Sequence, residues 1–330
     1  MKPLRALTII ILVATTLAAL PGQALGDSDE VLYVLAQEPT SSGGEFHLVR
    51  VDFTSSGFDL TSVVELTNGV DTGEYLGAPS GLVHDGTDFY MTTIAGINEA
   101  DPGLTRLYTI NTSTGATTLV GNSNIEYGHS ISKDHVTDTF WIFFDEYEVT
   151  RYNTDSFAEI DLADAQVDTN TIQQPAGGGY NFATIDAFGS AFGYLSGSPD
   201  KYFRTELSTG NGSPNCSSSG FETCFNLLNS VMGHPDALAV DPDTADTFAL
   251  EASGSSSSPE LEIRLVKPVG GTVQVVYIGA TSGFGSAGSL GGATFAPNTQ
   301  SDPPPLTPDE KAALIYNSVF DDTPTPTPTP

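Results

Sequence analysis

Residues 107–121 read LYTINTSTGATTLVG, in which an alternating apolar run meets a Ser-Thr-Gly turn and a second run follows at once. The stretch before it, APSGLVHDGTDFYMTT at 78–93, likewise has two apolar runs separated by a turn sequence. Period-2 alternation bounded by Gly, Asp and Thr is typical of short antiparallel strands joined by tight turns. The sequence therefore predicts four consecutive strands, at 80–84, 89–93, 106–111 and 117–121.

This four-strand unit recurs along the chain. HSISKDHVTDTFWIFF begins at 129, NFATIDAFGSAFGYLS at 181 and PDALAVDPDTADTFALEAS at 235. Aligning the first strand of each unit places these residues in equivalent positions, about 50 residues apart: Ser80, His129, Asn181, Asp236 and Gly291. A repeated four-strand unit of this length indicates an all-β protein of the β-propeller class.

The two ends of the array complement each other. Segments 31–37, 45–53 and 59–66 supply a second, third and fourth strand without a first, whereas 288–297 supplies a first strand alone. Pairing them in one shared blade closes the ring and removes an exposed edge. We therefore predict five four-stranded blades; six would require a hidden unit in 163–180 or 197–222. Six aromatic residues are expected to pack between blades: Tyr33, Phe46, Tyr108, Phe140, Trp141 and Phe248.

Three of these stretches carry a resemblance to a known family. LYTINTSTGATTLVG, ALAVDPDTADTFAL and GGATFAP resemble secreted bacterial β-propellers of a domain family without assigned function, within the quinoprotein- and YVTN-like propeller group. The resemblance covers about 30–298; the opening unit and the closing strand match well, and the third and fourth units diverge. It implies the fold and brings no catalytic residues with it.

The ends of the sequence predict export and a tail. Residues 1–26 combine Lys2 and Arg5 with an apolar run and a small-residue cleavage site, as in a secretory signal peptide; a retained anchor is the alternative. The propeller domain should then span 27–298. Residues 299–330 are expected to form a Pro-rich linker, a short helix and a stiff Thr-Pro tail, which is either a stalk or the approach to a further segment. We therefore expect a secreted, periplasmic or cell-surface protein without a membrane span after signal removal.

The net charge limits the classes of partner, and the two cysteines predict a disulfide. The formal charge is −30, with 11 Lys and Arg against 41 Asp and Glu. Binding to nucleic acid or to anionic membranes needs clustered basic residues, so neither partner is expected. Cys216 and Cys224 are the two cysteines, and in an exported protein such an isolated pair is expected to form a disulfide.

The aligned strand starts define a candidate site at one mouth of the predicted central channel. Its members are polar or aromatic residues at or just before these starts: Ser80, Glu126, Tyr127, His129, Asn181, His234 and Asp236. Such residues either cap backbone groups and hold channel waters, or bind a small ligand, Ca²⁺ or another divalent metal. No cofactor is evident. The stretch DPDTAD at 241–246 is interpreted as a turn in which Asp side chains bind the backbone.

Two functional hypotheses follow. The first is an exported, non-catalytic module that binds a protein or glycan ligand, tethered through its tail. The alternative is a hydrolase: a glycan-active enzyme using Glu126, Asp186 and Asp236, or a metal-dependent enzyme using His129, Asn181, Asp236 and Glu126. The Asp in a "DP" context that five-bladed glycosidases typically show is missing from 30–40, which favours binding. Ligand identity and oligomeric state are not specified by the sequence.

Overall fold

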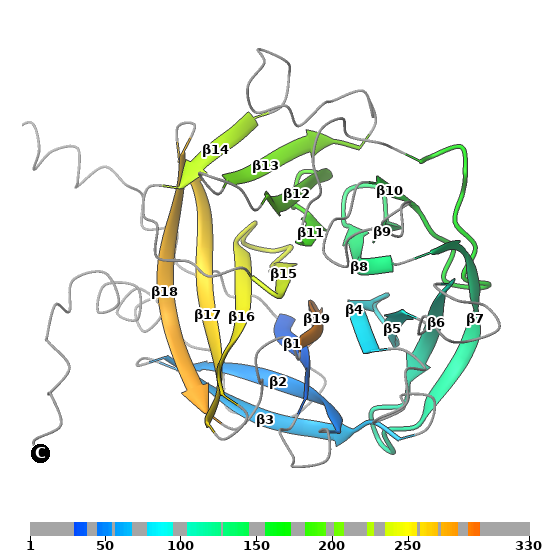
Figure 1. The fold of residues 1–330 in the computed structure, drawn as a ribbon, viewed down its shortest axis with the longest axis horizontal. Helices are drawn as coiled ribbons and strands as arrows, with labels where there is room; N and C mark the ends of the chain where they lie inside the picture. The colour runs from blue at the N-terminus through cyan, green and yellow to red at the C-terminus, as the bar shows by residue number, and fades with distance from the viewer. Residues whose placement is uncertain are drawn as a thin grey trace, which may run out of the picture.

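A computed structural model describes fourteen stretches of the chain: 30–37, 45–54, 57–67, 78–94, 104–126, 128–144, 156–172, 182–195, 201–207, 223–227, 235–255, 258–269, 272–282 and 290–297. These stretches contain strands and turns and no helix, so none of them could cross a membrane as a helix. The strands stand around a common centre and form a propeller-like ring (Figure 1). The predicted all-β ring is thus confirmed.

Hydrogen bonding organises the strands into four sheets. The first contains β19 (Leu290–Pro297), β1 (Glu30–Gln37), β2 (Phe46–Thr54) and β3 (Gly57–Glu65), in that order. The second contains β4 (Ala78–His84), β5 (Phe89–Ile94), β6 (Leu104–Ile110) and β7 (Thr117–Glu126). The third contains β8 (Gly128–Asp134), β9 (Thr139–Phe144) and β10 (Ser156–Glu159).

The fourth sheet has eight strands. One half is β11 (Phe182–Ile185), β12 (Ser190–Leu195), β13 (Lys201–Glu206) and β14 (Thr223–Leu227). The other half is β15 (Ala237–Val240), β16 (Thr247–Ser255), β17 (Ser258–Val269) and β18 (Thr272–Ser282). A short parallel pairing of Asn226 with Thr272 and Leu227 with Val273 joins them. The hydrogen bonds therefore give four sheets, and not the five separate blades that the repeat predicted.

The predicted pairing of the two chain ends is present. β1 runs antiparallel to β19 from Glu30 opposite Pro297 to Ala36 opposite Leu290. The strands of the second sheet also lie where the opening stretch predicted them. The second result follows from period-2 patterning, and the first from the complementary ends of the array.

Apolar clusters fill the spaces between neighbouring sheets. Tyr33 and Tyr108 lie between the first and second sheets, and Phe248 lies between the first and fourth. Trp141 is also buried, whereas Phe46 and Phe140 are partly buried against these clusters. The six aromatic residues thus pack as predicted, and this packing holds the ring together.

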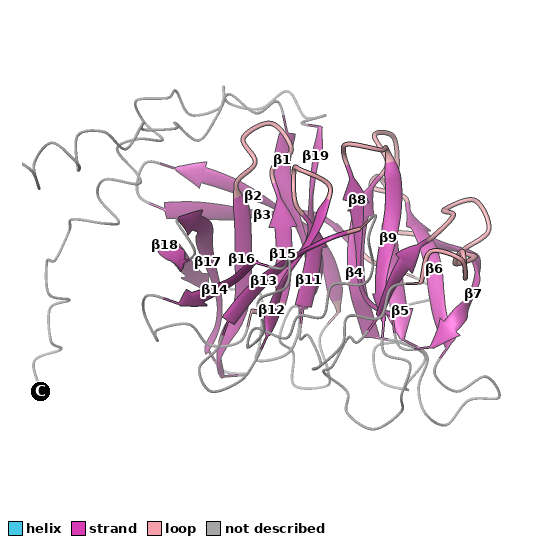
Figure 2. Ribbon diagram, turned by 90° about the horizontal axis from the view of Figure 1, so that it is seen from above, coloured by secondary structure: helices cyan, strands magenta, loops and turns pink. Residues whose placement is uncertain are grey.

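The strands nearest the centre are β4, β8, β11, β15 and β19, here called the inner strands (Figure 1). Each has a leading end, where the strand begins, and a turn end, which approaches the hairpin to the second strand or, for β19, lies beside the start of β1. Seen from the side, the inner strands stand nearly parallel to the ring axis, with described turns at one end of the ring (Figure 2). The predicted channel-mouth residues that the structure describes lie at the leading ends, and a larger cavity beside Asp88 lies at the turn ends.

Candidate functional site

The leading ends of three inner strands share one irregularity. Ser80 in β4, His129 in β8 and Gly291 in β19 are each skipped in the pairing with the second strand, as the extra residue of a β-bulge. A bulge leaves that residue outside the ladder and redirects its side chain. The alignment that placed these three residues in equivalent positions is therefore correct at the level of register.

Two of the predicted site residues form hydrogen bonds with the backbone. Ser80 Oγ donates to the carbonyl oxygen of Gly128 at 2.6 Å, which ties β4 to β8. Asp236 Oδ2 accepts a hydrogen bond from the backbone N–H of Ala252 at 2.7 Å. Ser130, next to a predicted position, likewise donates to the carbonyl oxygen of Ala183 at 2.9 Å. These bonds between neighbouring strands match the capping role that was one of the two interpretations.

The channel between the leading ends is nearly filled. Ser80 and Asp236 line the same cavity, whose volume is about 10 Å³. A cavity of this size holds about one water molecule. The structure therefore brings two of the predicted residues together, but around a space too small for a sugar.

Glycines at two inner strands explain the narrow channel. A Cβ on Gly81 would lie 2.7 Å from the backbone nitrogen of Ile131, and one on Gly292 would lie 2.5 Å from that of Leu82. Gly292 also has a φ of +126°, which other residues rarely adopt. The backbones of β19, β4 and β8 approach so closely because these positions carry no side chain.

His129 and Glu126 lie in contrasting environments. His129 is nine-tenths buried, and burial lowers its pKa from 6.5 to about 4. Its Nε2 has no hydrogen-bond partner among the residues that the structure describes. Glu126 is exposed at the end of β7, opposite Leu104. Neither residue lines the cavity that Ser80 and Asp236 share.

The remaining predicted residues lie outside the described part of the chain: Tyr127, Asn181 and His234. The predicted disulfide cannot be placed either, because Cys216 is not described and only the backbone of Cys224 is. Residues 1–26 and 299–330 are also outside the described ranges. The signal peptide, the tail, the disulfide and a metal at the channel mouth therefore stay predictions.

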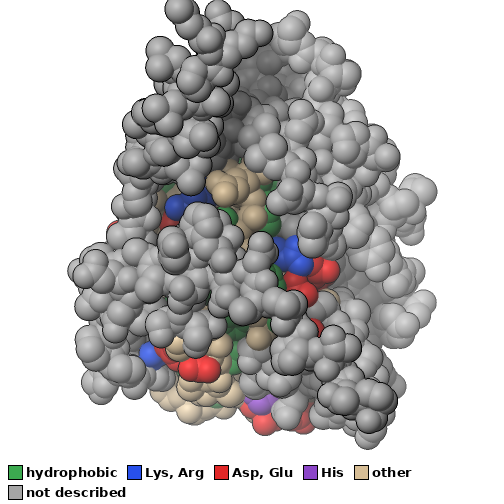
Figure 3. Space-filling view, turned by 90° about the vertical axis from the view of Figure 1, so that its left-hand side faces the viewer, with side chains coloured by type: hydrophobic (Ala, Val, Ile, Leu, Met, Phe, Trp, Pro, Cys, Tyr) green, Lys and Arg blue, Asp and Glu red, His purple; other side chains and the backbone are tan. Residues whose placement is uncertain are grey.

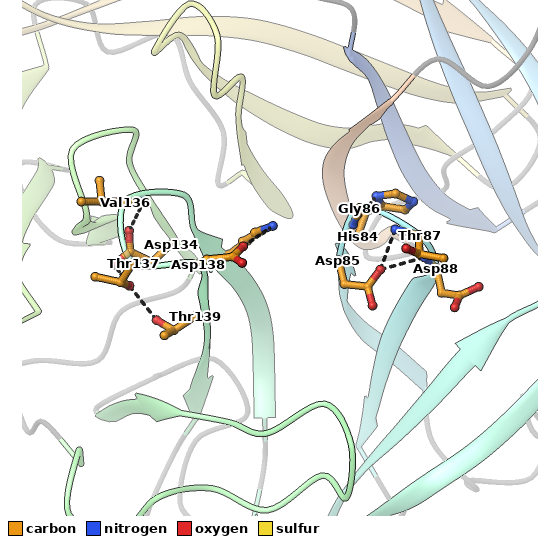
Figure 4. Close-up of polar contacts among 11 residues, drawn as sticks. His84, Asp85, Gly86, Thr87, Asp88, Asp134, Val136, Thr137, Asp138 and Thr139 are labelled. Carbon is orange, nitrogen blue, oxygen red and sulfur yellow. Dashed lines mark hydrogen bonds and ion pairs between the residues drawn. The ribbon is translucent and has the colours of Figure 1, made fainter.

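At the turn ends, the same type of turn recurs, in which an Asp side chain accepts hydrogen bonds from its own turn. Asp134 Oδ1 accepts the backbone N–H of Val136 at 2.8 Å, while Thr137 Oγ1 donates to Oδ2 at 2.6 Å (Figure 4). Asp241 Oδ1 accepts the N–H groups of Asp243 and Thr244. In each turn the residue four positions on donates its N–H to the carbonyl of the first and has a positive φ. The interpretation of DPDTAD as such a turn is confirmed.

Charged groups meet at the turn ends. Burial, with repulsion by Asp243 and Asp241, raises the pKa of Glu30 from 4.5 to about 7, and Lys133 opposes that shift. Lys133 forms an ion pair with Asp138 at 2.7 Å. A second channel cavity, of about 20 Å³, lies beside His84, Lys133 and His135. It too is water-sized.

Ion pairs also occur among the outer strands. Lys267 Nζ lies 3.0 Å from Asp246 Oδ1, and Arg264 forms an ion pair with Glu262 on the same strand. Figure 3 shows basic and acidic side chains next to one another on one lateral face. The basic side chains of Lys267 and Arg264 thus pair with acidic residues close to them in the fold.

A larger cavity opens between the first and second sheets at the turn ends, with a volume of about 390 Å³. We call it the Asp88 groove. It is lined by Tyr33, Val63, His84, Thr87, Asp88, Phe89, Ile110, Asn111, Thr112, Ser113 and Pro297. Sequence reasoning missed it, because it searched the opposite end of the channel. The polar turns at 85–88 and 111–115, beside the aromatic Phe89, were the available signal.

The hydrogen bonds within the Asp88 groove show which of its polar groups are left to donate to a ligand and which can accept. His84 Nδ1 accepts the backbone N–H of Gly86 at 3.0 Å (Figure 4). Burial lowers the pKa of His84, against the effect of Asp85 and Asp88, so the ring is neutral at pH 7 and Nε2 carries the proton. Asn111 Oδ1 accepts N–H groups of Ser113 and Thr114, which leaves its Nδ2 group as a donor. The Asp88 carboxylate is exposed and can accept.

Comparison with known proteins adds little beyond this geometry. No family model matches the sequence, and no curated protein matches it significantly. Among solved structures, a nidogen/laminin complex is similar at 12% identity and a TM-score of 0.43, covering 82% of this chain and 99% of that one. A GH43 glycoside hydrolase has 14% identity, covers 77% of this chain and 54% of that one, and has a TM-score of 0.43.

An exo-β-1,3-galactanase from Phanerochaete chrysosporium has 11% identity and a TM-score of 0.43, with coverage of 77% and 59%. The chain thus spans little more than half the length of these two hydrolases. Likenesses this distant carry no argument about ligand or activity. The residues of the site itself must therefore carry any functional conclusion.

Proposed function

We propose that this protein is an exported, non-catalytic binding module, and that the Asp88 groove binds a small neutral saccharide. The observation that carries the proposal is the groove itself, whose volume of about 390 Å³ lies in the range of ligand pockets. The two described channel cavities, at about 10 and 20 Å³, are far smaller.

The groove offers what a hydroxylated ring requires. His84 Nε2–H and Asn111 Nδ2 can donate hydrogen bonds, and the Asp88 carboxylate can accept them. Phe89 provides an apolar wall and packs edge-on against Tyr33, with ring centroids 4.9 Å apart. A neutral ligand is favoured because a protein with a formal charge of −30 repels anions.

A binding role is also supported by how the carboxylates near the channel are used. Asp134, Asp186 and Asp241 all accept backbone N–H groups within their own turns. Asp186 additionally pairs with Arg204 at 2.5 Å. These groups stabilise turns, whereas a glycosidase needs two carboxyl groups that face its substrate.

Calorimetric titration with neutral oligosaccharides, and with an acidic oligogalacturonide for comparison, tests this proposal. We expect a neutral saccharide to bind and to be recovered intact. Asp88→Ala and His84→Ala should each weaken binding at least about tenfold, because each removes a side-chain group that forms a hydrogen bond to the ligand. Asp138→Ala, in the β8–β9 turn outside the groove, is the matched control. Binding that these groove variants leave unchanged would place the site elsewhere, and cleavage would make the protein an enzyme.

We further infer that the eight-stranded sheet corresponds to two blades, β11–β14 and β15–β18, giving five in all. The apolar cluster that contains Phe192, Tyr194 and Tyr202 packs one half against Leu238 and Val266 of the other. Halves of one flat sheet would not face each other in this way. The parallel pairing that joins them spans two residue pairs.

Export is the remaining part of the proposal, and it rests on the pattern of residues 1–26. Expression of the full chain in a bacterial host should place a shortened protein outside the cytoplasm. Its N-terminal sequence should begin close to residue 27. Recovery of the uncut chain from the membrane fraction would instead support the retained anchor.

A further inference from the structure

Three metal-ligating side chains converge on the outer part of the first sheet. A ligand atom from each of Glu45, His47 and Glu65 lies within 4.8 Å of the other two. His47 is the second residue of β2, Glu45 immediately precedes that strand, and Glu65 ends β3. None of the three lines the Asp88 groove or either channel cavity.

Strand geometry explains the convergence. His47 and Glu65 are directly opposed in the β2–β3 ladder. Such opposed residues have Cβ atoms about 4.5–5.5 Å apart. Glu45 is two residues before His47, and the period of 2 in extended chain places both on one face of the sheet.

A β-bulge adds a fourth residue to this face. Leu48 opposes Val64, but Val49 opposes Ser62, so Val63 is skipped. The skipped residue reverses the alternation and brings Ser62 to the same face as Glu65. Without the bulge, Ser62 would point to the opposite face. The register shift therefore builds the surroundings of His47.

Ser62 orients the imidazole. Its Oγ lies 3.1 Å from His47 Nδ1, and His47 is 8% exposed. When Ser62 accepts the Nδ1 proton, Nε2 presents its lone pair, as second-shell partners of metal-bound histidines commonly arrange. The two carboxylates are exposed, which gives an ion access from solvent and room for water ligands.

We propose that Glu45, His47 and Glu65 bind a first-row divalent transition metal ion, with Zn²⁺ as the best fit. Imidazole and carboxylate are both Zn²⁺ ligands, and the affinity of such a site for Mn²⁺ is lower than its affinity for Zn²⁺. Ca²⁺ and Mg²⁺ prefer all-oxygen sites, so the histidine selects against them. Two carboxylates supply the compensating charge. The bound ion joins the beginning of β2 to the end of β3.

The test uses the full chain, stripped of metal with a chelator and then dialysed against Zn²⁺, Mn²⁺ or Ca²⁺. We expect one Zn²⁺ per chain, weaker uptake of Mn²⁺, no uptake of Ca²⁺, and a rise in Tm with Zn²⁺. His47→Gln and Glu65→Gln should weaken Zn²⁺ binding at least about a hundredfold. Ser62→Ala should weaken it about tenfold while leaving all three ligands in place.

His135→Gln is the matched control, because His135 also neighbours carboxylates, Asp134 and Asp138, but lies at the turn ends. It should bind Zn²⁺ as the unchanged protein does. Glu65→Gln replaces an exposed side chain, so it keeps the test valid if His47→Gln fails to fold. The proposal fails if Zn²⁺ uptake is absent, equals that of Ca²⁺, or survives in Glu65→Gln. The three residues would then be an ion pair without a metal.

Discussion

The leading ends and the turn ends of the inner strands are held by different physical means. At the leading ends, bulged residues and glycines let the backbones of separate sheets meet, as where Ser80 Oγ bonds Gly128 O. At the turn ends, single Asp or Asn side chains bind the backbone of their own hairpin. The first arrangement depends on neighbours about 50 residues away, the second on residues within four positions. Damage should therefore spread from the leading ends and stay local at the turn ends.

Gly292→Ala tests the leading ends most severely. The new Cβ would lie 2.5 Å from Leu82 N in a backbone with a φ of +126°, and neither strand can withdraw without breaking the ring. We expect a loss of about 3 kcal/mol or more in the free energy of unfolding. Denaturant unfolding measures it. Gly86→Ala, where the φ is +106° but the added Cβ meets nothing within 4 Å, should cost only about 1–2 kcal/mol. Equal losses would remove the distinction between the ends.

The buried His129 at the leading ends should make the stability of the protein depend on pH. Its pKa is about 4 in the folded protein against 6.5 ordinarily, so below pH 6.5 the proton binds preferentially to the unfolded chain. Between pH 6.5 and 4 this should cost about 3 kcal/mol of stability. His129→Leu should lose less stability over that interval, measured by urea unfolding at several pH values. Parallel curves for the two proteins would contradict a buried neutral histidine.

Asp134→Ala tests the turn ends. It removes the acceptor for Val136 N–H and for Thr137 Oγ1, so the free energy of unfolding should fall by about 1–2 kcal/mol. Asp134→Asn keeps an accepting oxygen and should cost less. Hydrogen exchange should show faster opening at 135–138 with little change in β4 or β11. Opening that extends around the ring would show that the turns are not local.

Glu30, at the turn ends, should respond to pH in the sense opposite to His129. Its pKa of about 7 exceeds the ordinary 4.5, so its contribution is fully present below pH 4.5 and is lost as the pH rises through 7. Because Glu30 is only partly buried, solvent reduces the effect to about 1 kcal/mol. Glu30→Gln should therefore be more stable than the unchanged protein at pH 8 and similar at pH 4.5. A lower stability of Glu30→Gln at pH 8 would contradict the raised pKa that burial and the repulsion by Asp243 and Asp241 produce.

Ala245→Gly should produce the smallest change. Ala245 has a φ of +60° in the β15–β16 turn, a conformation that costs an alanine about 1–2 kcal/mol and a glycine little. The extra freedom of glycine in the unfolded chain offsets part of that gain, which leaves a stabilisation of about 0.5–1 kcal/mol. Ala163→Gly, in the 161–165 turn but without a positive φ, should not stabilise. Melting temperatures of the two variants decide the matter.

Much of the fold could be predicted because it rests on short-range patterns. Alternation in 80–121 located the strands of the second sheet, and Asp241 followed by Pro and Asp indicated its turn. The complementary ends of the array identified the pairing of β1 with β19. The candidate site was less accessible. Ser80 and Asp236 do share a cavity, but the width of that cavity depends on how closely the backbones of separate sheets approach.

The sequence by itself determined the all-β repeat, the closing strand, the acidic surface and the local turns, because alternation, spacing and side chain–backbone bonds act over a few residues. Only the tertiary structure decided that the described channel cavities are no larger than a water molecule, that the Asp88 groove opens between two sheets, and that a skipped Val63 turns Ser62 toward His47. Those features depend on register and on the approach of distant backbones. No single stretch of sequence encodes either.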